Sequence, residues 1–202
     1  MSCRVVLVGG GSYSWTPRLA TDLFLKKGLR GGRLVLVDKD PEAAELLRRY
    51  TILLSEKIGT GWCVEVAALE PALEGADAVC ISISTGDLDA MQLDYSIPET
   101  FGVYHTVADT MGPGGISRSL RNIPVFLDIA RKMERICPDT WLVHVTNPLN
   151  QLTRVVAKET AIKCAGLCHG YAGTVAFLAT FLGAEIDEID AVSVGVNHGT
   201  WL

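Results

Sequence analysis

The stretch Val5-Val6-Leu7-Val8-Gly9-Gly10-Gly11-Ser12 decides the fold of this chain. Four consecutive apolar residues that favour strands are typical of a strand buried on both faces of a parallel sheet. The three glycines that follow let the backbone turn sharply and approach a pyrophosphate with no Cβ atom in the way. We predict a helix from Thr16, its N-cap, and Pro17, its first residue, whose free N–H groups point at that anion.

The glycine-rich turn matches the dinucleotide fingerprint Gly-x-Gly-x-x-Gly only in part. Gly9 and Gly11 fill the first two glycine positions, but Ser14 stands in the third, and a purely structural turn explains the pattern as well. The next apolar run, 33–37, ends at Asp38, where the fingerprint expects an acid that binds the adenosine ribose. We therefore expect NAD, since a carboxylate repels the 2′-phosphate of NADP. The alternative is that Asp38 is an ordinary loop carboxylate.

Composition limits the class of protein. A chain of 202 residues holds one ordinary α/β domain and perhaps the start of a second. Its 18 basic and 23 acidic residues give a net charge of -5 and no basic cluster, so we expect no nucleic-acid partner. The apolar runs are shorter than the roughly 20 residues of a membrane span and no signal peptide is evident, so we expect a cytoplasmic protein with no membrane partner. Six cysteines without a Cys-x-x-Cys pair predict free thiols.

Strand-like and helix-like segments alternate along the chain, which favours an α/β fold of the Rossmann type with a mainly parallel sheet and helices on both faces. Pro124 is expected to kink the helix that contains it. We predict further strands at 63–67, 78–83, 141–146, 162–167 and 189–196, and helices at 41–58, 69–74, 116–137, 149–158 and 173–182.

The segment 85–115 has no clear periodicity and is rich in polar, aromatic and turn residues. Because it follows the carboxyl end of a strand, we predict a functional loop, with a merely long connection as the alternative. Arg118 and Arg121 lie off the apolar face of the helix that follows. They are expected either to bind an anionic substrate or to lie on a solvated surface.

Several polar residues follow predicted strands, so in a parallel sheet they lie at one edge together with the glycine turn. Asn147 is placed to bond a ribose or sugar hydroxyl, whereas His144 lies inside its strand and is expected in the core. Cys168 and His198 each follow a strand and together make a reasonable two-point metal site. Their separation of thirty positions carries no spacing signal, so a structural role stays open.

Taken together, these residues resemble glycoside hydrolase family 4, the NAD- and divalent-metal-dependent glycosidases. The resemblance runs over nearly the whole chain. It rests on Gly9-Gly10-Gly11-Ser12, Asp38-Lys39-Asp40-Pro41, Gly75-Ala76-Asp77, Ile97-Pro98, Gly112-Pro113-Gly114-Gly115, Leu120-Arg121-Asn122-Ile123-Pro124, Thr146-Asn147-Pro148, Gly166-Leu167-Cys168-His169 and Asn197-His198-Gly199-Thr200-Trp201.

The resemblance implies a lactate/malate-dehydrogenase-like NAD-binding domain over 1–188, with 189–202 as the start of a C-terminal catalytic domain. It implies that Cys168 and His198 hold a divalent metal, Mn²⁺ in the first instance, and that Asn147 contacts the substrate as well as the cofactor. The cofactor residues that we expect are Gly9, Gly10, Gly11, Ser12, Tyr13, Asp38 and Asn147.

The implied chemistry departs from the usual hydrolysis by two carboxylates. In the family, NAD⁺ oxidises the C3 hydroxyl of the sugar, which acidifies the proton on C2, while the metal chelates the C2 and C3 oxygens. Elimination breaks the C1–O bond, water adds, and NADH returns the hydride. Here His169 follows the metal-binding cysteine, which resembles the branches that act on unphosphorylated α-glycosides, especially α-glucuronidases and α-galacturonidases. Asp109 stands where phospho-sugar members carry glutamate.

These implications define the expected function. We expect hydrolysis of a small-molecule glycoside, an α-glycoside or α-uronide, with His169 as the acid for the leaving group and Asp109 and Asn147 at the sugar. Family members are longer, and we expect the full-length protein to form a homo-oligomer. Because their C2 base lies in a C-terminal domain, we expect this chain alone to bind NAD and turn over little glycoside. The alternatives are a 2-hydroxyacid dehydrogenase and an inactive NAD-binding module.

Overall fold

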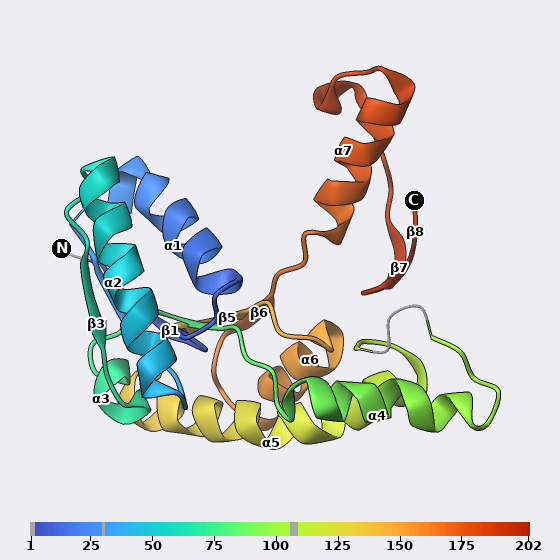
Figure 1. Ribbon diagram of the computed structural model, residues 1–202, viewed down its shortest axis with the longest axis horizontal. Helices are drawn as coiled ribbons and strands as arrows, with labels where there is room; N and C mark the ends of the chain where they lie inside the picture. The colour runs from blue at the N-terminus through green and yellow to red at the C-terminus, as the bar shows by residue number, and fades with distance from the viewer. Residues whose placement is uncertain (1–2, 30, 106–108) are drawn as a thin grey trace.

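The computed structural model describes residues 3–29, 31–105 and 109–202. Its main element is a six-stranded parallel sheet in the order β3-β2-β1-β4-β5-β6, in which the chain reverses its direction of progress between β1 and β4 (Figure 1). The strands are β1 (Arg4–Val8), β2 (Arg33–Val37), β3 (Cys63–Val66), β4 (Ala78–Ile81), β5 (Trp141–His144) and β6 (Cys164–Gly166). The predicted Rossmann-type sheet is thus confirmed.

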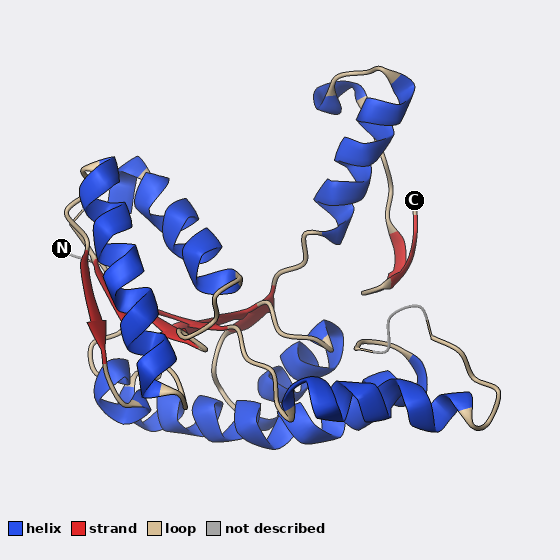
Figure 2. Ribbon diagram, viewed as in Figure 1, coloured by secondary structure: helices blue, strands red, loops and turns tan. Residues whose placement is uncertain are grey.

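Helices cover both faces of this sheet (Figure 2). α1 and α2 pack on one face, and α3, α5 and α6 pack on the other. α7 and an antiparallel hairpin of β7 and β8 extend away from the sheet (Figure 1). The helices are α1 (Trp15–Leu25), α2 (Pro41–Ile58), α3 (Leu69–Leu73), α4 (Asp87–Glu99), α5 (Gly112–Ile136), α6 (Leu149–Glu159) and α7 (Gly170–Leu182), with short 3₁₀ turns η1 (Lys27–Leu29) and η2 (Ile186–Glu188), and the hairpin strands are β7 (Val194–Val196) and β8 (Gly199–Trp201).

The strands supply apolar side chains to both faces, as a sheet covered on both sides requires. In β1, Val6 and Val8 pack in the same cluster as Phe126 of α5. Leu7, between them, packs with Phe24 of α1 on the opposite face. All five side chains are buried, so the apolar run of β1 forms the centre of two cores.

The described helices include none long and apolar enough to cross a membrane, and the six cysteines are free thiols.

His144 of β5 is completely buried, which confirms the prediction of a core histidine. Its ring meets Phe126 edge-on, with the ring centroids 5.1 Å apart. Nδ1 lies 3.2 Å from the carbonyl oxygen of Thr146, and because a carbonyl only accepts, Nδ1 carries the proton. Nε2 lies 2.8 Å from the hydroxyl oxygen of Thr153, which also donates to the carbonyl oxygen of Leu149 at 2.8 Å.

The buried ring of His144 makes the protein sensitive to acid. Burial lowers its pKa to about 4, against the opposing effect of the bond to Thr146. The unfolded chain binds the proton near its ordinary pKa of about 6.5, so this contribution is complete above that pH and is lost as the pH falls towards 4. We expect urea unfolding to show a loss of about 3 kcal/mol between pH 7 and pH 4. The loss should be smaller in His144→Gln, and an equal loss there would assign it to other groups.

The prediction of an irregular loop over 85–115 was wrong for most of that segment, because it contains α4 and the start of α5. The buried residues of α4 are Asp94 and Pro98, whereas Leu88 and Leu93 are exposed. With polar residues inside and apolar residues outside, the helix lacks the periodicity by which helices are predicted.

The start of α1 also differs from the prediction. Trp15 is the first helical residue, so Thr16 is not the N-cap and Pro17 is the third residue of the helix. Thr16 is buried, and its hydroxyl donates to the carbonyl oxygen of Gly10 at 2.9 Å. The N-cap residue is Ser14, whose side chain makes no capping bond, and Ser12 Oγ accepts the N–H of Trp15 at 3.2 Å.

In the C-terminal part of the chain, other predicted boundaries also differ from the structure. The strand expected over 189–196 is reduced to β7, which pairs only with β8, because the segment lies outside the main sheet. The strand expected over 162–167 is reduced to β6, and α7 begins at Gly170 rather than at 173. α5 continues through Pro124 as one helix.

The large apolar residues of α2 are only partly buried. Leu47 is buried, but Leu46, Tyr50 and Leu53 are exposed. The buried face of α2 instead includes the small and polar residues Ala44, Thr51 and Ser55.

Candidate active site at the carboxyl edge of the sheet

The glycine-rich turn follows β1 and is held tightly against the neighbouring strands. Gly9 has φ of +92°, and a Cβ atom there would lie 1.9 Å from the carbonyl oxygen of Ser82. A Cβ atom at Gly10 would lie 2.7 Å from Cβ of Leu36. Both positions therefore require glycine for the packing of the turn itself.

The backbone N–H groups of the turn divide into two sets. Those of Gly9 and Gly10 donate to the carbonyl oxygen of Val37 at 2.8 and 3.0 Å. The N–H of Gly11 donates to Oδ2 of Asp38 at 2.8 Å, and that of Ser12 bonds within the turn. In the described part of the chain, the N–H groups of the next two residues, 13 and 14, donate to no protein oxygen. They lie just before the N-terminus of α1, so they are placed to bind a phosphate.

Asp38 organises the turn in this structure. Besides the bond from Gly11, its Oδ1 accepts the N–H of Asp40 at 3.0 Å. Because each carboxylate oxygen can accept more than one bond, these contacts leave lone pairs for a ribose hydroxyl. Ser14 is exposed, so a serine at the third glycine position does not disturb the packing of α1 on the sheet.

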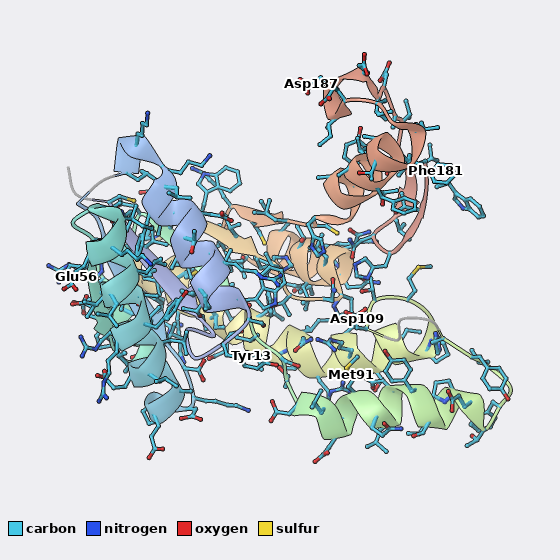
Figure 3. All side chains as sticks on the ribbon, turned by 45° about the horizontal axis from the view of Figure 1, so that its top comes forward. Tyr13, Glu56, Met91, Asp109, Phe181 and Asp187 are labelled. Atoms are coloured by element: carbon cyan, nitrogen blue, oxygen red, sulfur yellow. The ribbon has the colours of Figure 1, made fainter. Side chains whose placement is uncertain are left out.

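A second cluster brings together three predicted site residues from separate segments. Nδ2 of Asn147, after β5, donates to Oδ2 of Asp109 at 2.8 Å. Oδ1 of Asp109 lies 3.5 Å from Nδ1 of His198, in the turn between β7 and β8. Nδ1 also lies 3.0 Å from the hydroxyl oxygen of Thr110. Asp109 lies between α5 and the C-terminal hairpin (Figure 3).

Two side chains of α5 form hydrogen bonds with the backbone of Asn147 and so hold this cluster in place. The carbonyl oxygen of Asn147 accepts bonds from Nδ2 of Asn122 at 3.0 Å and from Nε of Arg118 at 3.3 Å. Asn122 is completely buried and its Oδ1 has no donor among the described residues. Sequence reasoning assigned no role to Asn122 or Thr110. The sequence does contain one signal for Asn122, because it is a polar residue at a core position of a predicted helix.

Arg121 neither lies free in solvent nor faces a ligand. Its guanidinium bonds both carboxylate oxygens of Asp94, at 2.8 and 2.5 Å, and the side chain of Asp94 is 2% exposed. Burial by itself raises the pKa of Asp94, but bonds from Arg121 and Ser117 and the charges of Arg121 and Arg118 outweigh it and lower the pKa. The pair fixes α4 to α5. Arg118 forms no ion pair with a described carboxylate, although its charge acts on Asp94.

Cys168 and His169 lie in the exposed connection between β6 and α7. The sulfur of Cys168 accepts the N–H of Gly170 at 3.3 Å. Across the described residues, no three or more His, Cys, Asp and Glu side chains are grouped to hold a metal ion. Among the described residues, no hydrogen bond or ion pair joins Cys168 to His198, so the two predicted metal ligands are not in direct contact. A thiolate and an imidazole suit a divalent transition metal, with substrate or water as the other ligands.

The glycine turn, Asp38 and Asn147 lie at the same edge of the sheet. The parallel register aligns Val8 with Val37 and Ile81, and Ile81 with His144. The glycine turn, Asp38 and Asn147 therefore all follow the carboxyl ends of adjacent strands. Tyr13, at the start of α1, is 87% exposed and marks the turn (Figure 3).

A parallel sheet of this order, with a glycine-rich turn where the order reverses, defines a Rossmann-type dinucleotide-binding domain. Its topology is that of lactate dehydrogenase: the enzyme from Eimeria maxima has a TM-score of 0.69 at 19% identity, over 96% of this chain and 53% of that one. The chain belongs to family 4 of the glycosyl hydrolases, whose family model matches residues 4–184.

Other proteins of this family are similar over almost the whole chain. The alpha-galacturonidase of Bacillus subtilis is 39% identical over 98% of this chain and 46% of its own length. The crystal structure of a protein from Bacillus subtilis described as a glucosidase has a TM-score of 0.87 at 37% identity, over 100% of this chain and 48% of that one. The chain therefore spans about half the length of the relatives it matches.

The fold is also shared with more distant family structures. The 6-phospho-beta glucosidase of Thermotoga maritima, solved with manganese, NAD⁺ and glucose-6-phosphate, has a TM-score of 0.85. It is 24% identical, over 98% of this chain and 48% of that one.

Proposed function

We propose that the complete protein is an NAD- and divalent-metal-dependent glycosidase that hydrolyses the O-glycosidic bonds of α-glycosides, with α-galacturonides as the preferred substrates. The similarity to an alpha-galacturonidase supports the choice of sugar. The half-buried guanidinium of Arg118 supports it as well, since it lies beside Asn147 and has no described carboxylate partner. A uronate carboxylate would complement that charge.

The observation that carries the proposal is the contact of Asn147 with Asp109, next to His198. Three polar residues from distant parts of the chain meet at the carboxyl edge of a dinucleotide-binding sheet. This is where open α/β sheets bind their ligands.

The residues divide into a cofactor set and a sugar set. In the cofactor set, the turn from Gly9 to Ser12 with the N–H groups of Tyr13 and Ser14 binds the pyrophosphate, and Asp38 binds the adenosine ribose. We assign 1–188 to this NAD-binding domain and 189–202 to the start of the catalytic domain.

In the sugar set, Asn147 and Asp109 bind hydroxyl groups, Cys168 and His198 hold the metal, and His169 delivers a proton to the leaving oxygen. When bound, NAD⁺ supplies a reversible hydride acceptor and Mn²⁺ supplies a Lewis acid. The structure of the Thermotoga maritima relative with manganese and NAD⁺ supports this pair of cofactors. We infer self-association of the complete protein, and the exposed apolar residues of α2 support it.

The test supplies the complete protein with NAD⁺, Mn²⁺ and a reductant in D₂O, with 4-nitrophenyl α-D-galacturonide or the matched neutral α-D-galactoside. We expect deuterium at C2 of the released sugar, no net NADH, and a higher kcat/KM for the galacturonide. The His169→Ala variant should lose more activity on alkyl glycosides than on nitrophenyl glycosides, because a poor leaving group needs the acid.

Each other outcome identifies an alternative. Net NADH without deuterium at C2 would contradict the proposal and favour a 2-hydroxyacid dehydrogenase, which the shared fold also permits. NAD binding without turnover and without dependence on Mn²⁺ would favour an NAD-binding module. Faster hydrolysis of the galactoside would overturn the choice of a uronide.

A further inference from the structure

The turn between β7 and β8 holds His198 in an unusual backbone conformation. Its φ is +61°, in the left-handed region that residues other than glycine seldom occupy. Such strain persists only where surrounding contacts fix the residue, and it is concentrated at functional sites. The side chain of His198 is 32% exposed, so burial alone does not hold it. The polar contacts of its ring lie at the Nδ1 atom.

Those contacts come from two adjacent residues before α5. The hydroxyl of Thr110 donates its only proton to Oδ1 of Asp109, at 3.0 Å, because a carboxylate only accepts. The same hydroxyl oxygen lies 3.0 Å from Nδ1 of His198, so in that contact it accepts. Nδ1 must then carry the proton of the neutral ring. Oδ1 of Asp109, at 3.5 Å, lies on the same side as a second acceptor.

The acceptors are themselves fixed in place. Thr110 is 2% exposed and the side chain of Asp109 is 15% exposed. Oδ2 of Asp109 is bonded by Asn147, whose carbonyl oxygen is bonded by Asn122 of α5. The orientation of the imidazole therefore depends on a chain of hydrogen bonds that ends in the buried face of a core helix.

We propose that Thr110 and Asp109 are positioning residues that hold the ring of His198 in its Nδ1–H tautomer, so that Nε2 is the atom that binds the divalent metal. This proposal rests on the proposed function for the role of the metal, but the tautomer is a property of the metal-free protein. Ligating histidines commonly donate their other ring N–H to such an acceptor, and loss of the acceptor weakens metal binding roughly 10- to 100-fold.

The experiment compares Thr110→Val, which removes the acceptor at nearly constant volume, with Thr110→Ser, which keeps the hydroxyl. The matched control is Thr140→Val, because Thr140 is also buried and its hydroxyl bonds the carbonyl oxygen of Ala76 at 2.7 Å, away from the site. The tautomer of His198 is read from long-range ¹H–¹⁵N spectra of the complete metal-free protein, at a pH where the ring is neutral. Mn²⁺ affinity is measured by electron paramagnetic resonance.

We expect the Nδ1–H tautomer in the wild type, Thr110→Ser and Thr140→Val, and a mixture of tautomers in Thr110→Val. Mn²⁺ affinity should fall roughly 10- to 100-fold in Thr110→Val only. An Nε2–H tautomer in the wild type, or unchanged affinity in Thr110→Val, would overturn the proposal. If Thr110→Val does not fold, Thr110→Ala, which also removes the hydroxyl acceptor, replaces it with the same expectations. The Nδ1–H tautomer without Mn²⁺ binding in the wild type would overturn the metal site while the positioning role stands.

Discussion

Replacing Gly9 by alanine is expected to lower the free energy of unfolding by roughly 3 kcal/mol or more, because it combines backbone strain with overpacking. The φ of +92° is unfavourable for any residue with a Cβ atom, and that atom would overlap the carbonyl oxygen of Ser82 in the adjacent strand segment. The obstacle is backbone, so it cannot rotate away. Urea unfolding of wild type and variant measures the change.

Gly173→Ala provides the control for the effect of Gly9→Ala. Gly173 lies inside α7, and no atom lies within 4 Å of the position of a new Cβ. An alanine in a helix interior is expected to be neutral or to stabilise by about 0.5–1 kcal/mol. If Gly9→Ala were as stable as Gly173→Ala, the turn would not be packed against β4 as described. Because the turn also forms the proposed pyrophosphate site, NAD affinity should fall in Gly9→Ala.

Replacing Asp94 by asparagine is expected to destabilise the protein by about 3 kcal/mol at pH 7, since it leaves the charge of Arg121 without its partner. The carboxyl of Asp94 has a lowered pKa in the folded protein. Its contribution is therefore present above the unfolded-state pKa of about 3.9 and is lost as the pH falls through the lower folded-state value. The difference between wild type and variant should accordingly shrink in acid.

The control for this ion pair is Asp128→Asn on the surface of α5. Asp128 pairs with Lys132 at 2.9 Å, but its side chain is 60% exposed. Exposed pairs contribute little, so we expect a change within about 0.5 kcal/mol. Equal effects of Asp94→Asn and Asp128→Asn in urea unfolding, or an effect of Asp94→Asn that does not depend on pH, would contradict the role of Asp94 in joining α4 to α5.

The parts of the fold that were predictable are those with strong local patterns. The apolar run before Gly9 predicted β1, and the pair Asp40-Pro41 predicted the start of α2, where Oδ1 of Asp40 accepts two backbone N–H groups at 3.0 Å. α4 was missed because its buried side is formed by Asp94 and Pro98. Its stability comes from the partner on α5, and a partner distant in the sequence leaves no periodic signal.

The candidate site was predictable as a set of residues but not as an arrangement. Asn147, Asp109 and His198 were each predicted as site residues, and the structure brings these three together. The supporting residues Thr110 and Asn122 were not identified. Their roles depend on which donors and acceptors face them after folding, and residue type alone does not specify that.

By itself the sequence determined the strand and glycine turn around Gly9, the alternation of strands and helices, and hence the parallel sheet with its polar edge. These features follow from local propensity and from the spacing of apolar residues. Only the tertiary structure decided that Arg121 is neutralised by Asp94, and that Nδ1 of His198 faces Thr110. Such pairings require segments far apart in the chain to meet, and their hydrogen-bond geometry exists only in the folded protein.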